Sequence, residues 1–236
     1  MRLIKSSFIT LSFLLLFSLS SFSQQCNFYM PLEVQSSIEY QNYDRRDRLQ
    51  GTQTVTVMAV NTSGDEVTAT IHATSLDDRD RVLHEAEYDI LCQGDKLKLD
   101  IQSLVDQNMI EGFGDMDLTI EGTELVMPAN LSVGQTLPDA EMTMVVENNG
   151  VSFATVTLNI TNRKVEGREE ITVPAGTFEV YKISYETHTE TRTMGIPIRV
   201  NTRTVEYHSP EVGMVRSEHF NRRDRLQGYT VLSKTN

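Results

Sequence analysis

Apolar and polar residues alternate with a period of two along most of this 236-residue chain, from Ile38 onward. Successive side chains of a β-strand point to opposite faces of a sheet, so this period is typical of half-buried strands. The alternation therefore predicts an all-β protein. Strands are expected at residues 54–57, 67–71, 83–91, 117–126, 142–146, 152–161, 170–173, 178–193, 198–207, 213–220 and 226–232, with at most one short helix at 101–109.

The longest alternating segment, residues 178–208, limits the architecture further. Its first strand alone would reach roughly 50 Å, two to three times the usual length of a strand. A flat sheet of that size would expose long edges, whereas a bent sheet absorbs the length. We therefore expect a single domain built from a strongly bent antiparallel sheet or incomplete β-barrel with long hairpins.

The turn of this hairpin sets its register. Pairing that is symmetric about Gly195 and Ile196 places Thr191 opposite Val200. The tip is expected to extend beyond the core, because most of the hairpin is polar on both faces.

Composition limits the classes of partner. The chain carries 33 acidic and 21 basic side chains, which gives a formal net charge of −12. Nucleic acids and anionic membrane surfaces both require a basic face on the protein, so this balance argues against either as the main partner. With 39% hydrophobic residues and no Pro- or Gly-rich linker, residues 24–236 are expected to form the single antiparallel β domain.

The first 23 residues have the features of a secretory signal peptide. Residues 1–23 begin with two cations, continue with a short apolar stretch and end in the small Ser23. The bulky Gln24 and Gln25 that precede Cys26 argue against lipid attachment at that cysteine. No later segment is long and apolar enough for a helical transmembrane anchor. We expect an exported protein of a Gram-negative bacterium, either periplasmic or secreted.

Export changes the interpretation of the two cysteines. In an oxidising compartment, Cys26 and Cys92 are expected to form one structural disulfide. Closing a loop of this size stabilises the folded state by about 4 kcal/mol. A redox role is the alternative, but the sequence has no C-x-x-C pair.

One heptapeptide occurs twice, letter for letter. Residues 45–51 and 222–228 both read RRDRLQG, and residues 77–82 are a weaker copy. Each copy follows an apolar or aromatic strand end, which favours a turn that is reused at equivalent places in the sheet. The alternative is a paired basic patch for phosphate or a sulfated glycan. The aspartate in each copy and the acidic chain favour the turn.

Four segments resemble the TapB-like family of exported bacterial proteins of unknown function. In residues 173–183, Pro174 and Gly176 supply the dihedrals of a tight turn between two strands. The matching segments are residues 29–44, 128–140, 173–183 and 213–218, in the family's order. The resemblance implies an exported, mainly antiparallel β protein and transfers no catalytic residue. Gln35 and Ser36 depart from the pattern, which usually has a glycine there.

The sequence contains no recognisable catalytic motif. It has no G-x-S-x-G, and neither cysteine has a histidine beside it. Its acidic residues offer many carboxylate pairs for a hydrolase, but there is no tryptophan to stack on a sugar. We therefore assign no catalytic residue and no cofactor, and keep a hydrolase with an unrecognised carboxylate site as an alternative.

A metal site is the other chemistry to weigh. Glu186, His188 and Glu190 lie two residues apart and so share one face of a strand. An exposed polar strand has the same pattern without a metal, because carboxylates about 7 Å apart need further ligands from elsewhere. Asp115 and Asp117 match no complete calcium loop. The sequence therefore predicts no metal site.

The interpretation favoured by these features is a non-enzymatic envelope protein that holds an apolar, lipid-like ligand or a partner strand. Tyr181, Ile183, Tyr185 and Val200 are the residues expected to face that ligand. The second hypothesis is a structural or interaction module that docks an envelope protein through the 178–208 hairpin.

Overall fold

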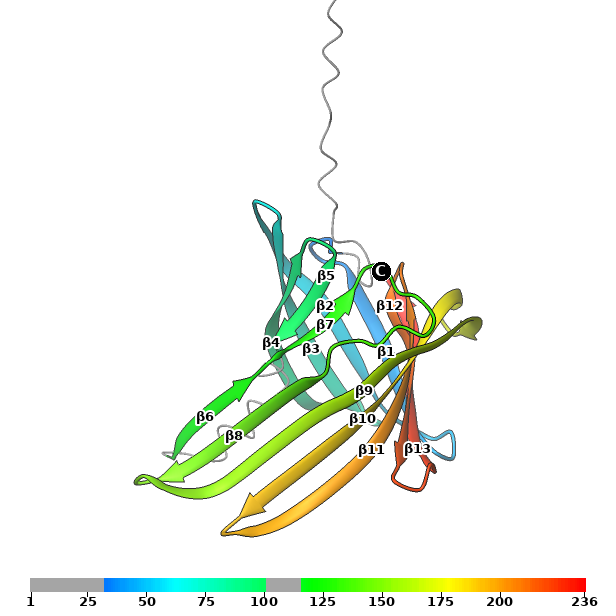
Figure 1. Cartoon of the computed structure of the whole chain (residues 1–236). Helices are drawn as coiled ribbons and strands as arrows, with labels where there is room; N and C mark the ends of the chain where they lie inside the picture. Colours follow the sequence, from blue (N-terminus) through cyan, green and yellow to red (C-terminus); the bar gives the residue numbers. More distant parts are fainter. Residues whose placement is uncertain (1–31, 101–115) are drawn as a thin grey trace, which may run out of the picture.

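The computed structural model describes residues 32–100 and 116–236, which form thirteen strands in one antiparallel sheet (Figure 1). The sheet curls into a nearly closed barrel, and the described residues contain no helix. The predicted all-β class and the bent, incomplete barrel are thereby confirmed. The helix expected at 101–109 and the signal peptide at 1–23 lie outside the described residues, so both remain predictions.

The strands are long and follow one another mostly as hairpins. In chain order they are β1 (Ser37–Asp44), β2 (Leu49–Ser63), β3 (Glu66–Asp77), β4 (Val82–Gln93), β5 (Lys96–Asp100), β6 (Asp117–Gly122), β7 (Glu124–Pro128), β8 (Ala140–Asn148), β9 (Val151–Val173), β10 (Gly176–Thr193), β11 (Ile196–Ser209), β12 (Gly213–Asn221) and β13 (Leu226–Thr235). Across the sheet the order is β6-β8-β9-β10-β11-β12-β13-β1-β2-β3-β4-β5-β7. Chain neighbours are therefore sheet neighbours almost throughout.

The two ends of the sheet are joined by a single residue. Strand β6 pairs with β8 and strand β7 pairs with β5, and only Thr123 separates β6 from β7. Its backbone N–H still donates to the Glu141 carbonyl on the β8 side, at 2.9 Å. One strand was predicted over residues 117–126. The structure instead shows an extended segment that changes partner midway and so closes the barrel.

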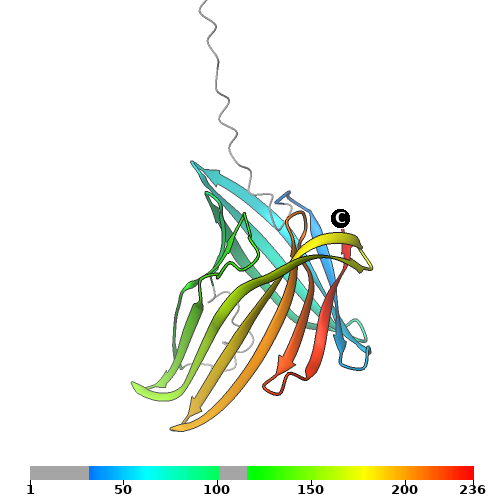
Figure 2. The same ribbon diagram turned by 45° about the vertical axis from the view of Figure 1, so that its right-hand side comes forward.

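Strand β9 also differs from the expectation. Residues 152–161 and 170–173 were predicted as separate strands, but they belong to one strand of 23 residues. Asn162 lies inside it with a positive φ of 56°, next to shifts in the β9–β10 register. Such bulges bend a strand and increase its twist. The far end of the β9–β10 hairpin arches over the sheet (Figure 2), where the Ala175 N–H donates to the Leu232 carbonyl at 3.4 Å.

The register of the β10–β11 hairpin is two residues away from the predicted one. Thr191 pairs with Ile198, and Val200 lies opposite Thr189. The turn is centred on Met194 and Gly195, whose φ values of 48° and 81° are both positive, as a two-residue type I′ turn requires. The prediction was wrong because it centred the turn one residue too late. Since the shift is even, every side chain keeps its predicted face.

The repeated heptapeptide is a turn, as the sequence favoured, and its weaker copy folds in the same way. Asp44, Asp77 and Asn221 each accept hydrogen bonds through Oδ1 from the backbone N–H groups two and four residues later, at 2.8–3.2 Å. The aspartate three residues after each of them has a positive φ of 54–59°. These turns join β1 to β2, β3 to β4 and β12 to β13.

The glycine of each full repeat has a separate role. Beyond each turn the register shifts by one residue against the preceding strand, and Gly51 and Gly228 lie close to the strand on their other side, β3 and β1 respectively. A Cβ atom on Gly51 would lie 2.1 Å from the Leu76 carbonyl oxygen, and one on Gly228 would lie 2.6 Å from the Tyr43 carbonyl oxygen. The heptapeptide therefore encodes a turn, a bulge and a close approach of two backbones.

We expect Gly51→Ala to lower the free energy of unfolding by about 2 kcal/mol or more, because the contact is with backbone that must move. Gly167→Ala is the matched control, since a Cβ at Gly167 meets nothing within 4 Å. Urea unfolding of both variants measures the difference. Equal stabilities would contradict the assigned role of the glycine.

Low pH should destabilise the two turns that contain Asp44 and Asp77, but not the turn that contains Asn221. Hydrogen bonds from Arg48 lower the pKa of the Asp44 carboxyl from 3.8 to about 2, and those from Arg81 lower that of Asp77 to about 2. A folded-state pKa below the unfolded value means that the stabilisation is present above about pH 4 and is lost as the pH falls towards 2.

Carboxyl NMR titration should show both low pKa values, and Asp44→Asn should keep the turn while removing its pH dependence. Asn221 is the natural precedent, because it makes the same pair of hydrogen bonds without a titrating group. Titration of Asp44 near pH 4 would contradict the assigned geometry.

Candidate binding site on the inner face of the barrel

The pairing of strands identifies which side chains point into the barrel. Tyr181, Ile183 and Tyr185 of β10 lie opposite the even-numbered residues of β11, among them Glu206. Burial raises the pKa of the Tyr40 phenol, and the nearby Tyr88 and Glu206 raise it further. These three residues belong to β1, β4 and β11, which are not neighbours in the sheet. They can meet only across the interior, so this face is the inner one.

The four residues predicted to face a ligand share this inner face but lie at different depths. Ile183 is 1% exposed and packs with Leu137 and Val165. Tyr181 packs beside the same group, and Tyr185 borders the apolar cluster of β8 and β9. Val200 is 53% exposed. The structure therefore aligns the four residues along one face, while their contact with a ligand stays a prediction.

A polar cluster around Glu206 lies inside the barrel, and no sequence motif pointed to it. The Tyr185 hydroxyl donates to Glu206 Oε1 at 2.6 Å, and His208 Nε2 lies 2.8 Å from Oε2. Glu206 and His208 are two apart on β11, and Tyr185 is on the adjacent strand β10. Alternation along residues 198–207 could have placed Glu206 inward, but it could not show that the barrel closes around it.

The electrostatics of this cluster favour a charged Glu206. Burial opposes ionisation of the carboxyl, but the hydrogen bonds from His208 and Tyr185 and the charge of Arg163 outweigh it and hold its pKa below the usual value. Burial raises the pKa of the Tyr185 phenol well above its usual value. The pair is therefore a carboxylate and a neutral phenol at neutral pH. A carboxyl with a lowered pKa is a poor general acid, which gives the hydrolase alternative no support here.

Arg163 stabilises the region where the segment 117–128 changes its strand partner from β8 to β5. The residue is 3% exposed, and its Nη1 donates to the carbonyls of Val126 at 3.0 Å and Pro138 at 2.6 Å. Val126 belongs to β7, and Pro138 lies in the segment that leads to β8. One guanidinium thus donates to two carbonyls at the place where the chain stops pairing with β8 and begins to pair with β5. Buried polar groups need such partners.

Next to the polar cluster the inner face becomes apolar. Strands β6, β8, β9, β10 and β11 are joined by direct pairing, so residues opposite one another form rows across the inner face. The three rows are Ile196–Thr193–Ala154–Val146–Leu118, Ile198–Thr191–Val156–Met144–Ile120 and Val200–Thr189–Leu158–Met142–Gly122. Met144 and Val146 are fully buried, and they anchor the apolar end of these rows.

The opposite end of the rows is exposed. Ile196, Ile198 and Val200 of β11 are 69%, 64% and 53% exposed, and we refer to them as the apolar rim. Large aliphatic side chains scattered singly on a surface need no explanation, but three on one face of one strand form a patch. In each row one threonine of β10 lies between the apolar rim and the apolar residues of β9, β8 and β6, which we refer to as the apolar wall. The sequence showed these residues on one strand face but not the wall that they extend.

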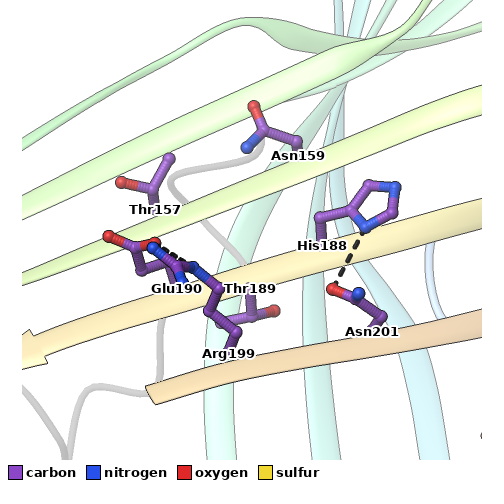
Figure 3. A pocket seen from close by; sticks show the side chains of 7 residues that line it. All are labelled: Thr157, Asn159, His188, Thr189, Glu190, Arg199 and Asn201. Carbon is purple, nitrogen blue, oxygen red and sulfur yellow. Dashed lines mark hydrogen bonds and ion pairs between the residues drawn. The ribbon is translucent and has the colours of Figure 1, made fainter. Parts of the chain in front are cut away.

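A polar hollow lies on the outer face of β9, β10 and β11 (Figure 3). It measures about 440 Å³, and its lining includes Asn159, His188, Glu190, Arg199 and Asn201. Glu190 pairs with Arg199 at 2.6 Å and with Arg192 at 2.8 Å. Hydrogen bonds from these arginines lower the pKa of the Glu190 carboxyl. Its carboxylate charge is therefore already neutralised by guanidinium groups.

The three residues weighed as metal ligands lie along this outer face. His188 Nε2 is 3.4 Å from Glu186 Oε2, and His188 Nδ1 is 3.2 Å from Asn201 Oδ1. Glu190 is held by its two arginines. Within residues 32–100 and 116–236 no group of three histidine, cysteine or acidic side chains has a metal-binding arrangement.

The predicted disulfide can be placed only in part. Cys92 is fully buried near the end of β4, at the end of the barrel where β1 begins. Cys26 lies outside the described residues, as does Asp115, so the Cys26–Cys92 bond stays a prediction. No helix in the part of the chain that the structure describes is long and apolar enough to cross a membrane.

Comparison with known proteins agrees with this architecture. The sequence model of the DUF3108-like family matches residues 35–232, and the chain belongs to this family. No match was found among curated protein sequences.

Two crystal structures have a similar fold. A candidate lipoprotein from Parabacteroides distasonis is 24% identical, with a TM-score of 0.70 over 90% of this chain and 100% of that one. A candidate exported protein with a YmcC-like fold from Bacteroides fragilis is 18% identical, with a TM-score of 0.68 over 89% of this chain and 100% of that one. At these identities the comparison shows a shared fold.

Tyr185→Phe removes the hydroxyl that donates to Glu206, so we expect the free energy of unfolding to fall by about 1–2 kcal/mol. The pKa of Glu206 should rise, because one of the bonds that favours its ionised form is lost. Chemical denaturation and carboxyl NMR titration measure the two effects. Tyr181→Phe is the control, and an equal loss in both variants would show that the Glu206 bond is not the cause.

Proposed function

We propose that this member of the DUF3108-like family is an exported, non-enzymatic protein of the cell envelope that binds an apolar, lipid-like molecule along the inner face of its barrel. The observation that carries the proposal is the apolar rim, which continues the buried wall of β6, β8 and β9 into solvent. Barrels of this general kind can enclose one small ligand or fill their interior with side chains.

The energetics favour reversible binding. An acyl chain that covers about 200 Å² of apolar surface gains about 5 kcal/mol, at roughly 25 cal/mol per Å². Ordering the chain and the exposed hairpin reduces that gain. The Glu206 cluster adds a polar group at the inner end of the apolar wall, so a molecule with an apolar tail and a hydrogen-bonding head matches the face better than a pure hydrocarbon.

Support for export comes from three sources. The signal-peptide pattern of residues 1–23 is the first. The second is the resemblance to the TapB-like exported proteins. The third is that the two structural neighbours are named as candidates for an exported protein and a lipoprotein. We propose the periplasm or the extracellular side of a Gram-negative envelope as the location.

A partner strand is the second candidate for the occupant, and one observation favours it. Strand β11 pairs with β12 only from Thr202 to Ser209, so residues 196–201 present an edge without a strand partner in the described part of the sheet. An extended peptide can add to such an edge through main-chain hydrogen bonds. The edge belongs to the 178–208 hairpin, so the docking hypothesis and the ligand hypothesis share this element.

Ligand binding can be tested with Val200→Glu, which puts a charge on the apolar rim. We expect uptake of a fluorescent fatty acid to fall at least tenfold, because an ionised carboxylate beside an acyl chain is strongly disfavoured. Asn201→Glu is the matched control, since its side chain is on the outer face of the same strand. Fluorescence titration of the two variants and the parent protein provides the comparison.

Native mass spectrometry of protein purified from its own compartment should also show a lipid-sized adduct that Val200→Glu lacks. A clean apo mass together with no fatty-acid uptake would refute the ligand. If Val200→Glu and Asn201→Glu lower binding equally, the inner face is not the site. Capture of an extended peptide by the parent protein, lost when residues 191–200 are deleted, would favour the partner strand.

A further inference from the structure

The two identical heptapeptides lie side by side in space. Strand β13 pairs with β1, so the β12–β13 turn and the β1–β2 turn are neighbours at the same end of the barrel (Figure 1). Five exposed arginines occupy these two turns, and we refer to them as the arginine patch: Arg45, Arg46, Arg222, Arg223 and Arg225. A repeat separated by 177 residues in the chain thus becomes one surface.

The carboxylates in these turns are engaged with other groups. Asp44 pairs with Arg48 at 2.5 Å, and Asp47 accepts a hydrogen bond from the Tyr229 hydroxyl at 2.9 Å. Asp224 pairs with Arg203 of β11 at 2.8 Å. Among the described residues, no member of the arginine patch forms an ion pair. The patch therefore holds five exposed guanidinium groups without an ion-pair partner among the described residues, and Asp47 is the one carboxylate of the two turns that no printed ion pair neutralises.

Exposed apolar turn residues lie at the same end of the molecule. The turns β3–β4, β8–β9 and β10–β11 lie at the same end of the barrel as the two arginine turns, and the tips of β8–β9 and β10–β11 splay away from them (Figures 1 and 2). Leu83, Val151 and Met194 stand at or beside these turns and are 61%, 69% and 76% exposed. A patch of cations combined with exposed apolar side chains at the same end of the molecule is characteristic of proteins that rest on a membrane surface.

We propose that this end of the barrel docks on a bilayer that contains anionic lipids. The arginine patch contacts lipid phosphates, which suit the planar guanidinium group, and the apolar turn residues enter the headgroup region. The whole chain carries a net charge of −12, so an anionic surface disfavours orientations that present the more acidic remainder of the protein. A soluble polyanion would use the arginines but leaves the exposed aliphatic turns unexplained.

This docking goes beyond ligand binding and depends on different residues. It also places the apolar rim at the membrane-facing end, because the rim begins directly after the β10–β11 turn. A lipid-like ligand could then pass between bilayer and barrel without crossing water.

The test uses the mature protein and vesicles of phosphatidylcholine with or without phosphatidylglycerol. Co-sedimentation should show binding to the anionic vesicles, weakened by salt. Neutralising Arg45, Arg46, Arg222 and Arg223 to glutamine should reduce the partition coefficient about 1,000-fold at low ionic strength, at about 1 kcal/mol for each cation. The matched control neutralises four cations away from these turns, Lys96, Lys164, Arg168 and Lys234, and should bind nearly as well as the parent.

Met194→Asn supplies the second arm, and it should weaken the binding that remains at high salt. Equal losses in the patch variant and the control would reduce the effect to net charge and overturn the proposal. Binding to soluble polyphosphate but not to vesicles would also overturn it. The patch variant should still take up fluorescent fatty acid in solution, so failure of membrane docking is distinguishable from failure of ligand binding.

Discussion

The unbroken ladder of main-chain hydrogen bonds that runs from β6 round to β7 is the interaction on which the rest of the structure depends. An open sheet of thirteen strands would leave two long edges with unpaired N–H and C=O groups. Here the two edge strands are one extended segment, which pairs with β8 before Thr123 and with β5 after it. The gap left at this exchange is filled by Arg163, whose guanidinium supplies the donors that a further strand would have supplied.

Curvature is built into this ladder at defined places. Register shifts occur beside Gly51 and Gly228, in the middle of β9–β10 and in the β11–β12 pair, and each adds bend and twist to a strand. The heptapeptide repeat provides two of them together with the turn that precedes each. Closure and curvature together create an inner face. On that face the Glu206 cluster is satisfied by Tyr185, His208 and the charge of Arg163, while the rows through Met144 stay apolar.

The candidate site follows from how far individual strands extend. Strands β10 and β11 run past the end of β12, so their inner face leaves the enclosed part of the barrel and becomes the apolar rim. The same end carries the arginine turns, because an antiparallel barrel returns every second connection to the same side. The composition argued against an anionic partner because the net charge is a sum over the whole chain. It does not show that the fold brings five exposed arginines together on two neighbouring turns.

Local patterns in the sequence determined most of the strands, the face on which their side chains lie and the heptapeptide turns, because alternation and turn chemistry act between near neighbours. They placed Tyr181, Ile183, Tyr185 and Val200 on one face even though the turn at Met194 was centred one residue too late. The tertiary structure alone decided that residues 117–128 change partner, that β9 is one strand and that Tyr88 and Glu206 come near Tyr40. These features depend on pairings between residues far apart in the chain. Such pairings are selected by closure of the whole sheet, and no short stretch of sequence specifies them.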